Sequence, residues 1–160
     1  LRPALWANLK EAKDMIALGM QQADLIKVSQ EEVEFLTGQA DAAQGAKQLY
    51  ATYHPALLAV TLGPGGCIYV TDGGAQQQPT FDTPCVDTTG AGDASWGAAL
   101  SWLLQQPAAP AELSAEAVRS LMDFANAAGS LATTKQGAIP AMPGRQEIEQ
   151  CIRTMPRLLR

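Results

Sequence analysis

The segment from Asp87 to Asp93, with the sequence DTTGAGD, constrains this chain more than any other stretch. Two glycines on either side of one alanine let the backbone turn tightly and point successive N–H groups at one place. The small and apolar residues 94–100 that follow predict a helix, whose positive N-terminal end would face that same place. The segment therefore predicts an anion site with the Asp93 carboxylate beside it, an arrangement that favours phosphoryl transfer. The alternative is a glycine-rich turn in front of a buried helix.

Composition limits the class of protein. The chain has 160 residues, of which 47% are hydrophobic and 17% charged, enough for one domain with its own core. No apolar run reaches the roughly 18 residues that span a bilayer, so we expect a cytoplasmic protein and no membrane partner. The net charge is −5 and no cluster of Lys and Arg is present, which argues against nucleic acid as a partner. The three cysteines fit no CxxC spacing and are interpreted as reduced, structural thiols.

Helical and strand patterns alternate along the first half of the chain. Helices are expected near residues 3–19, 29–38, 41–53, 92–105, 114–134 and 144–154, and strands near 23–28, 56–61, 67–71 and 75–81. Ser29 with Glu32 three residues later is typical of a capping box, and Gly38 would end that helix. The alternation predicts an α/β fold with a parallel sheet and covering helices, while the glycine-rich turns after residues 61 and 71 predict hairpins.

Five stretches together resemble the ribokinase or PfkB family of sugar kinases. They are LRPALW from Leu1, KVSQEEVEFLTG from Lys27, VTLGPGGCIYV from Val60, DTTGAGD from Asp87 and FANAAGSLATTKQGAIPAMP from Phe124. The resemblance implies a ribokinase-like three-layer α/β/α sandwich with a mostly parallel central sheet. It also implies that residues 1–160 are the C-terminal part of a single PfkB-type kinase domain whose N-terminal half and lid are absent. The opening LRPALW is most similar to the fructokinase branch.

The resemblance assigns catalytic roles to the glycine-rich segment. Asp93 matches the family's catalytic base, which accepts the proton of the sugar hydroxyl as that hydroxyl attacks the γ-phosphate of ATP. Gly90, Ala91 and Gly92 match the anion hole, whose N–H groups would hold the charge that builds on the transferred phosphoryl group.

Further residues match the nucleotide and magnesium sites of the family. Thr61, Gly63 and Gly66 resemble the nucleotide-binding turn, and Asn126 stands where relatives place a residue beside the adenine. Glu32 matches an acidic residue linked to Mg²⁺ through water. Simpler roles stay open at each position: a hairpin turn for residues 63–66, a buried amide hydrogen-bonded within its own helix for Asn126, and the capping box for Glu32.

Relatives also bind a monovalent cation beside the anion hole. Asp87, Thr89, Thr134 and Gly137 match the residues that hold it. Ala141 stands where many relatives supply a serine oxygen, so the sequence departs from the family pattern at one ligand position. From the residues alone, 133–136 are more simply interpreted as a helix end.

The resemblance implies ATP-dependent phosphorylation of a sugar hydroxyl, with ATP and Mg²⁺ required and K⁺ as a candidate cation. Fructose is the favoured sugar, and 2-keto-3-deoxygluconate, ribose and aminoimidazole riboside are alternatives. A homodimer of the full-length protein stays open. A noncatalytic nucleotide-binding fragment is the competing interpretation from another class. A dinucleotide-binding oxidoreductase is disfavoured, because Ile68 stands where a GxGxxG motif needs its last glycine.

Overall fold

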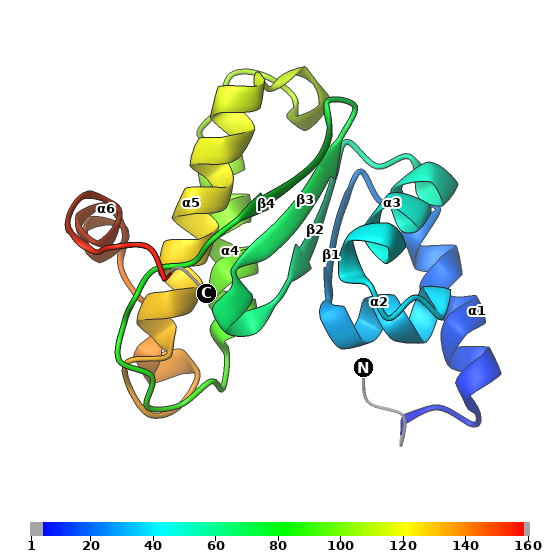
Figure 1. Ribbon diagram of the computed structural model, residues 1–160, viewed down its shortest axis with the longest axis horizontal. Coiled ribbons are helices and arrows are strands. Elements are labelled where there is room, and N and C mark those ends of the chain that lie inside the picture. The colour runs from blue at the N-terminus through cyan, green and yellow to red at the C-terminus, as the bar shows by residue number, and fades with distance from the viewer. Residues whose placement is uncertain (1–4, 159–160) are drawn as a thin grey trace. The chain divides into compact units, whose positions relative to one another are not determined.

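All four described strands of the computed structural model lie before residue 79, together with α1 to α3, and the described elements after them are helices (Figure 1). The structure describes residues 5–158. The α-helices are α1 (Leu9–Met20), α2 (Gln30–Thr37), α3 (Ala42–Tyr53), α4 (Ala91–Leu103), α5 (Ala115–Ala132) and α6 (Arg145–Thr154). The strands are β1 (Leu25–Ser29), β2 (Leu57–Thr61), β3 (Cys67–Thr71) and β4 (Gly74–Gln78). No described helix is both long and apolar enough to span a membrane.

The predicted α/β class is confirmed, and the sheet is mixed. Its four strands lie in the order β1-β2-β3-β4. The chain passes from β1 to β2 through α2 and α3, whereas short turns join β2 to β3 and β3 to β4, as predicted for hairpins. The strand predicted over 75–81 ends at Gln78, because the next residue is Pro79, which has no N–H for a sheet ladder. Phe81 pairs separately with Arg157 in an isolated antiparallel bridge.

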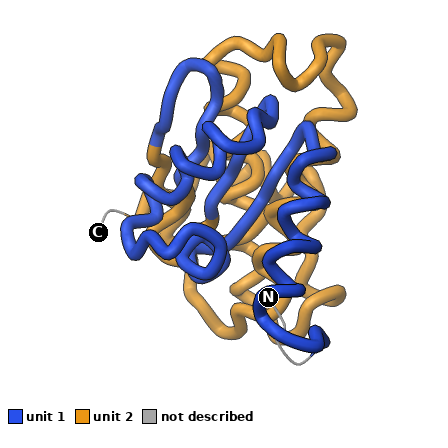
Figure 2. Tube along the Cα trace, turned by 90° about the vertical axis from the view of Figure 1, so that its right-hand side faces the viewer, with its two compact units in different colours: residues 1–60, 68–76 blue, residues 61–67, 77–160 orange. Residues whose placement is uncertain are grey.

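The chain divides into two compact units (Figure 2). The first comprises residues 1–60 and 68–76 and contains α1 to α3. Its helices α2 and α3 approach closely at Gly45, where a Cβ would collide with Val33 Cγ1 and lie 3.1 Å from Thr37 Oγ1. The absence of a side chain at Gly45 therefore allows these two helices to pack.

The second unit comprises residues 61–67 and 77–160 and holds α4, α5 and α6. Helix α5 contacts both α4 and α6. Their shared core is apolar and consists of Phe81, Ala98, Phe124, Ala127, Ala128, Ile148 and Cys151. Alanines on the facing sides of α4 and α5 allow the two helices to lie close together, and this packing fixes the start of α4 in space.

The first helix differs from its prediction. The pattern suggested a helix from Pro3, which lies outside the described residues, whereas α1 begins at Leu9. Asn8 caps it, because the Asn8 side chain accepts a hydrogen bond from the Glu11 N–H at 2.8 Å. Glu11 in turn accepts one from the Ala7 N–H at 3.1 Å. The capping pair decides where α1 begins, and the apolar periodicity alone did not reveal it.

Candidate functional site

The N-terminus of α4 is left open by the chain. Its N-cap is Gly90, which has φ 80° and ψ 0° and provides no side-chain cap. The Ala91 N–H reaches the Thr88 carbonyl at 3.2 Å. Among the described residues, the N–H groups of Gly92 and Asp93 have no acceptor within the chain. Two donors and the positive end of the helix dipole therefore point outward, which is the condition for binding an anion.

This open end is unusual within the described part of the molecule. Side-chain oxygens of Asn8, Ser29, Asp41 and Ser114 cap α1, α2, α3 and α5. In α6 the Glu147 carboxylate reaches back to the Gly144 N–H at 2.7 Å. Helix α4 alone among these six has neither arrangement. The predicted anion hole at residues 90–93 thus coincides with the one described α-helix start that no side chain closes.

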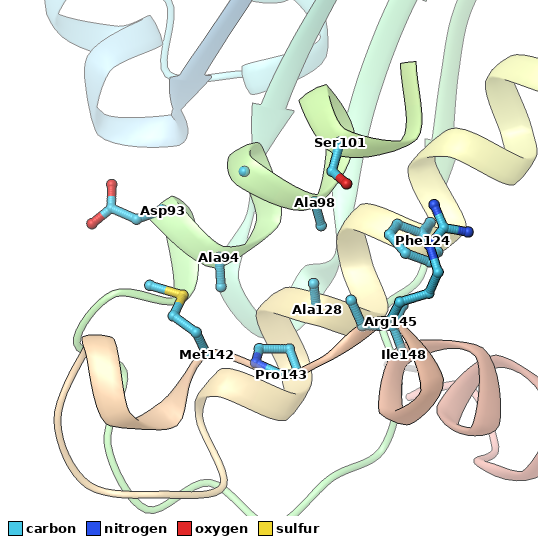
Figure 3. Close-up of a pocket in the computed structure, with 11 residues that line it drawn as sticks. Asp93, Ala94, Ala98, Ser101, Phe124, Ala128, Met142, Pro143, Arg145 and Ile148 are labelled. Carbon is cyan, nitrogen blue, oxygen red and sulfur yellow. The ribbon is translucent and has the colours of Figure 1, made fainter. Parts of the chain in front are cut away.

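Asp93 is exposed in the first turn of α4 and lines a pocket of about 230 Å³. Figure 3 shows its carboxylate at one end of this pocket, with the Met142 side chain beside it and Ser101 and Arg145 toward the other end. Of the predicted site residues, only Asp93 lines the pocket. Sequence reasoning missed Met142, because nothing in the pattern of its loop indicates where that loop folds.

The loop that carries Met142 packs against the glycine-rich turn. A Cβ on Gly90 would lie 2.8 Å from Ala138 Cβ and 3.5 Å from Met142 Cε. Glycine is required here for two reasons, since its φ is positive and the space for a side chain is already filled. The close contact holds the turn against residues 138–142.

The Asp87 carboxylate ties the turn to the same loop. One carboxylate oxygen accepts from the Thr89 N–H and the other from the Gly137 N–H, each at 2.9 Å. The hydrogen bonds from Gly137 and then Thr89 hold the pKa of Asp87 below its ordinary value. The Thr133 carbonyl accepts from the N–H groups of Val86 and Asp87 at 2.7 and 3.1 Å. This role of Thr133 could not be predicted from the sequence, because any residue type can supply a backbone carbonyl.

The structure brings together three of the four predicted cation ligands. Asp87, Thr89 and Gly137 meet through the hydrogen bonds just described, while the Thr134 hydroxyl donates to the Leu131 carbonyl at 2.7 Å. Carboxylate, hydroxyl and carbonyl oxygens are donors that suit a hard cation, and each Asp87 oxygen keeps a lone pair beyond its N–H bond. Within residues 5–158, no group of three or more His, Cys, Asp and Glu side chains could hold a metal ion.

The turn between β2 and β3 is closed by its own backbone. The Leu62 N–H donates to the Gly66 carbonyl at 2.9 Å, and the Gly66 N–H donates to the Gly63 carbonyl at 3.0 Å. Gly63 and Gly66 have φ values of 55° and 83°. A Cβ on Gly66 would collide with the Gln78 carbonyl oxygen, so this glycine also allows a close backbone approach. Thr61, at the end of β2, is half-buried.

Asn126 lies on α5 and is 6% exposed. Its side-chain amide donates to the Cys67 sulfur at 3.4 Å, across to the first residue of β3 rather than within its own helix. Burial raises the pKa of the Cys67 thiol to about 12, so this sulfur stays protonated and uncharged at neutral pH. The amide predicted to lie beside adenine is therefore committed to a neighbour in the core.

Glu32 belongs to the first unit and forms the predicted capping box. Its carboxylate accepts from the Ser29 N–H at 2.8 Å, and the Ser29 hydroxyl accepts from the Glu32 N–H at 3.3 Å. Gly38 follows α2 with φ 74° and ends that helix, as predicted. The capping role of Glu32 is confirmed, and its role toward magnesium stays a prediction.

Comparison with known proteins identifies the family to which the chain belongs. The pfkB family of carbohydrate kinases matches residues 1–145. Probable fructokinase-2 from Arabidopsis thaliana is 42% identical over 145 residues, which are 89% of this chain and 43% of that protein. The chain thus spans less than half the length of this curated relative.

Two solved structures share the fold. A fructokinase double mutant from Vibrio cholerae O395, with fructose, ADP and potassium bound, has a TM-score of 0.86 and 30% identity over 95% of this chain and 48% of its own. Aminoimidazole riboside kinase from Salmonella enterica, with its sugar and an ATP analogue, has a TM-score of 0.84 and 28% identity over 96% of this chain and 50% of its own. The ribokinase-like fold expected from the sequence is confirmed. The chain therefore belongs to the pfkB family of carbohydrate kinases.

Proposed function

We propose that this chain carries the phosphoryl-transfer site of an ATP-dependent, fructokinase-like sugar kinase. The observation that supports the proposal most strongly is the uncapped start of α4, where the N–H groups of Gly92 and Asp93 have no acceptor among residues 5–158 and lie beside an exposed carboxylate. Phosphoryl transfer needs positioning and charge stabilisation more than covalent help from the protein, and this arrangement offers both.

The proposed reaction assigns one role to each group. The sugar hydroxyl oxygen forms a bond to the γ-phosphorus of ATP while the bond from that phosphorus to the bridging oxygen of ADP breaks. Asp93 accepts the hydroxyl proton, and the backbone N–H groups of residues 90–93 stabilise the charge on the transferred group. The N–H groups of Gly92 and Asp93 are the main donors, since that of Ala91 is shared with the Thr88 carbonyl.

The remaining residues are assigned to the nucleotide and the ions. Thr61, Gly63 and Gly66 form the proposed nucleotide-binding turn, and Asn126 is assigned to the same site. Asp87, Thr89, Thr134 and Gly137 are the proposed monovalent cation site, which the potassium-bound Vibrio relative supports. Glu32 would hold Mg²⁺ through water, an ion that usually keeps several of its waters and neutralises phosphate charge.

We further propose that the 160 residues are the C-terminal part of one kinase domain. The family match over residues 1–145 together with the 43–48% coverage of relatives supports this.

Fructose is the favoured substrate, and aminoimidazole riboside, ribose and 2-keto-3-deoxygluconate are the alternatives. The proposed compartment is the cytoplasm, which three free cysteines favour. A homodimer stays a prediction.

The test is a coupled assay of the intact polypeptide that contains this chain, with ATP and each sugar in turn. We expect turnover that is fastest with fructose. Asp93→Asn should lower kcat by roughly 10²- to 10⁴-fold while ADP binding, measured by calorimetry, persists. Undiminished kcat in the Asp93→Asn variant would remove Asp93 from the mechanism.

The second candidate is a noncatalytic nucleotide-binding fragment, which the partial coverage of relatives favours. The same assay on the 160-residue chain separates the two. Turnover by the short chain would exclude the fragment, whereas ADP binding without turnover would support it.

A further inference from the structure

A polar stripe runs along the buried face of α5. Asp123, Asn126 and Ser130 are spaced by three and four residues, so they lie on one side of the helix. Asn126 is 6% and Ser130 7% exposed, within a helix whose other buried residues are apolar or alanine. Buried polar groups lose free energy unless they are paired, so each needs a specific partner.

The side chains of Asp123 and Ser130 find partners in residues 78–83, which comprise the last residue of β4 and the segment after it. The Gln78 amide Nε2 donates to Asp123 Oδ1 and, at 3.1 Å, to the Arg119 carbonyl. The Thr80 hydroxyl lies 2.6 Å from Ser130 Oγ and 3.5 Å from the Asn126 carbonyl oxygen. The Thr83 hydroxyl donates to the Ser130 carbonyl at 3.1 Å. The repeated pairing fixes the register between α5 and this segment, because a shift by one residue would leave several buried groups unpaired.

Arg157 also holds this segment in place. Its guanidinium pairs with Asp123, donates to the Pro79 carbonyl at 3.3 Å and lies 4.0 Å from the centre of the Phe81 ring. The C-terminal residues also pair with the segment through Leu158 N–H to the Thr80 carbonyl at 2.9 Å. Residues 78–81 are thus held by both α5 and the chain end.

This segment supports the turn assigned to the nucleotide. Gly66 packs directly on the backbone of residues 78–80, so closely that no side chain would fit. Cys67, the next residue, is fully buried and accepts the Asn126 amide. Asn126 is therefore the one member of the stripe that reaches the turn's own strand through its side chain.

We infer that Asn126 is a positioning residue of the nucleotide-binding turn, acting through Cys67 and not by touching the base. The inference rests on the proposed function for the identity of the turn. The observation behind the inference does not depend on the proposed function. The Asn126 amide is 6% exposed and already bonded to the buried Cys67 sulfur, so it has little surface left for a ligand. A turn held in its binding geometry loses less conformational entropy when the nucleotide binds.

The two roles predict different nucleotide selectivity. An amide that reads the base favours adenine over guanine, and its loss weakens ADP alone. An amide that positions the turn affects whatever phosphate chain the turn holds, and its loss weakens ADP and GDP equally. The link to Cys67 adds a second criterion, since only the positioning role makes the sulfur matter.

The experiment measures Kd for ADP and for GDP by calorimetry on the intact polypeptide. We expect Asn126→Ala and Cys67→Ala each to weaken both nucleotides by about threefold to tenfold, the loss of one hydrogen bond. The double variant should be no weaker than either single variant, because both remove the same link. Cys67→Ser keeps an acceptor at this position and should stay within about twofold of the wild type.

Val118→Ala is the matched control, since Val118 is a buried apolar residue of α5 outside the stripe. We expect it to lower Tm without changing either Kd. Loss of ADP binding alone in Asn126→Ala, with Cys67→Ala unchanged, would overturn the inference in favour of base contact. A lower Tm with both Kd values unchanged would overturn it in favour of a merely structural role.

Failure of the proposed function has a separate signature. Absence of sugar phosphorylation together with the expected pattern of Kd values would contradict the kinase assignment and leave the positioning role standing. If Asn126→Ala does not fold, the pair Cys67→Ala and Cys67→Ser decides: equal affinities in these two variants would overturn the inference.

Discussion

Helices α2 and α4 begin in opposite ways. The start of α2 is closed by a reciprocal pair, in which Ser29 and Glu32 each bond the other's backbone N–H. The start of α4 has Gly90 at the same position and leaves the Gly92 and Asp93 N–H groups without acceptors in the described chain. Both segments carry acidic residues in the first turn. The difference is that the Ser29 side chain accepts from a backbone N–H at the start of α2, whereas no described side chain does so at the start of α4.

A capped start stabilises the protein and cannot bind a ligand through the same N–H groups. Glycine at an N-cap costs only a few tenths of a kcal/mol relative to Ser or Asp, so an open end is inexpensive in stability. Groups outside α4 keep its open start in place, because Asp87 and the loop at 137–142 contact the turn at Gly90. The comparison indicates that the start of α2 is closed in favour of stability, whereas the start of α4 keeps N–H donors available for an anion.

The largest expected effect comes from adding one methyl group to the open end. Gly90→Ala should lower kcat by about 10²-fold. The new Cβ would collide with Ala138 and move the turn, so the N–H groups of Gly92 and Asp93 would no longer point at the transferred phosphoryl group. A left-handed backbone adds a conformational cost of roughly 1–2 kcal/mol. Steady-state kinetics and thermal unfolding of the same preparation measure the two effects.

Gly38→Ala is the matched control. Gly38 ends α2 with φ 74° and nothing within 4 Å of the added Cβ, so it carries the conformational cost without the collision. We expect a lower Tm and an unchanged kcat. Equal loss of kcat in both variants would show that general destabilisation explains the Gly90 effect.

The next effect concerns the group that holds the open end. Asp87→Asn replaces one of two accepting oxygens with an NH₂ group that faces the Gly137 N–H. We expect the K⁺ concentration for half-maximal activity to rise at least about tenfold, since the loss of even an outer-shell partner can weaken metal binding that much. Activity titrations with KCl measure it, and an unchanged K⁺ dependence would remove Asp87 from the cation site.

The pH dependence of this variant follows from the lowered pKa. Ionised Asp87 accepts hydrogen bonds in the folded state, so its pKa there lies below the unfolded value of about 3.9. Its stabilisation is present at neutral pH and is lost as the pH falls through the folded value. The Tm difference between wild type and Asp87→Asn should therefore be largest near neutrality and shrink in acid. A difference that grows in acid would contradict this assignment.

The smallest effect is expected at the closed end. Ser29→Ala should destabilise the protein by about 1 kcal/mol and leave kcat unchanged, because it removes only the cap.

Glu32→Gln should keep Tm, since Gln also completes a capping box, while raising the Mg²⁺ concentration needed for activity. A lower Tm with an unchanged Mg²⁺ requirement in Glu32→Gln would reduce Glu32 to the cap alone.

Local patterns predicted the elements well where the sequence marks both ends. Ser29, Glu32 and Gly38 delimit α2 as expected, and the predicted helices after residue 90 match α4 to α6 within two residues. Such signals are local, because caps and periodicity involve residues three to four apart. The start of α1 was missed because the Asn8 and Glu11 pair was overlooked in favour of Pro3.

Contacts between distant segments could not be predicted in this way. Asn126 was assigned to adenine because the resemblance places it at a position that lies beside adenine in relatives. Only the fold reveals that its amide reaches Cys67, 59 residues away. The spacing of Asp123, Asn126 and Ser130 was visible in the sequence and marks a polar face. Its partners in residues 78–83 were not visible, because pairing across more than 40 residues depends on packing.

The most direct test of the open helix start observes its N–H groups. The ¹H–¹⁵N resonances of Gly92 and Asp93 would be recorded in the intact polypeptide with Mg-ADP and fructose, before and after addition of aluminium fluoride, which mimics the transferred phosphoryl group. We expect both resonances to shift, while those of Ala43 and Gln44, already bonded to Asp41, stay in place. Unchanged resonances of Gly92 and Asp93 in the saturated complex would contradict the proposed anion hole.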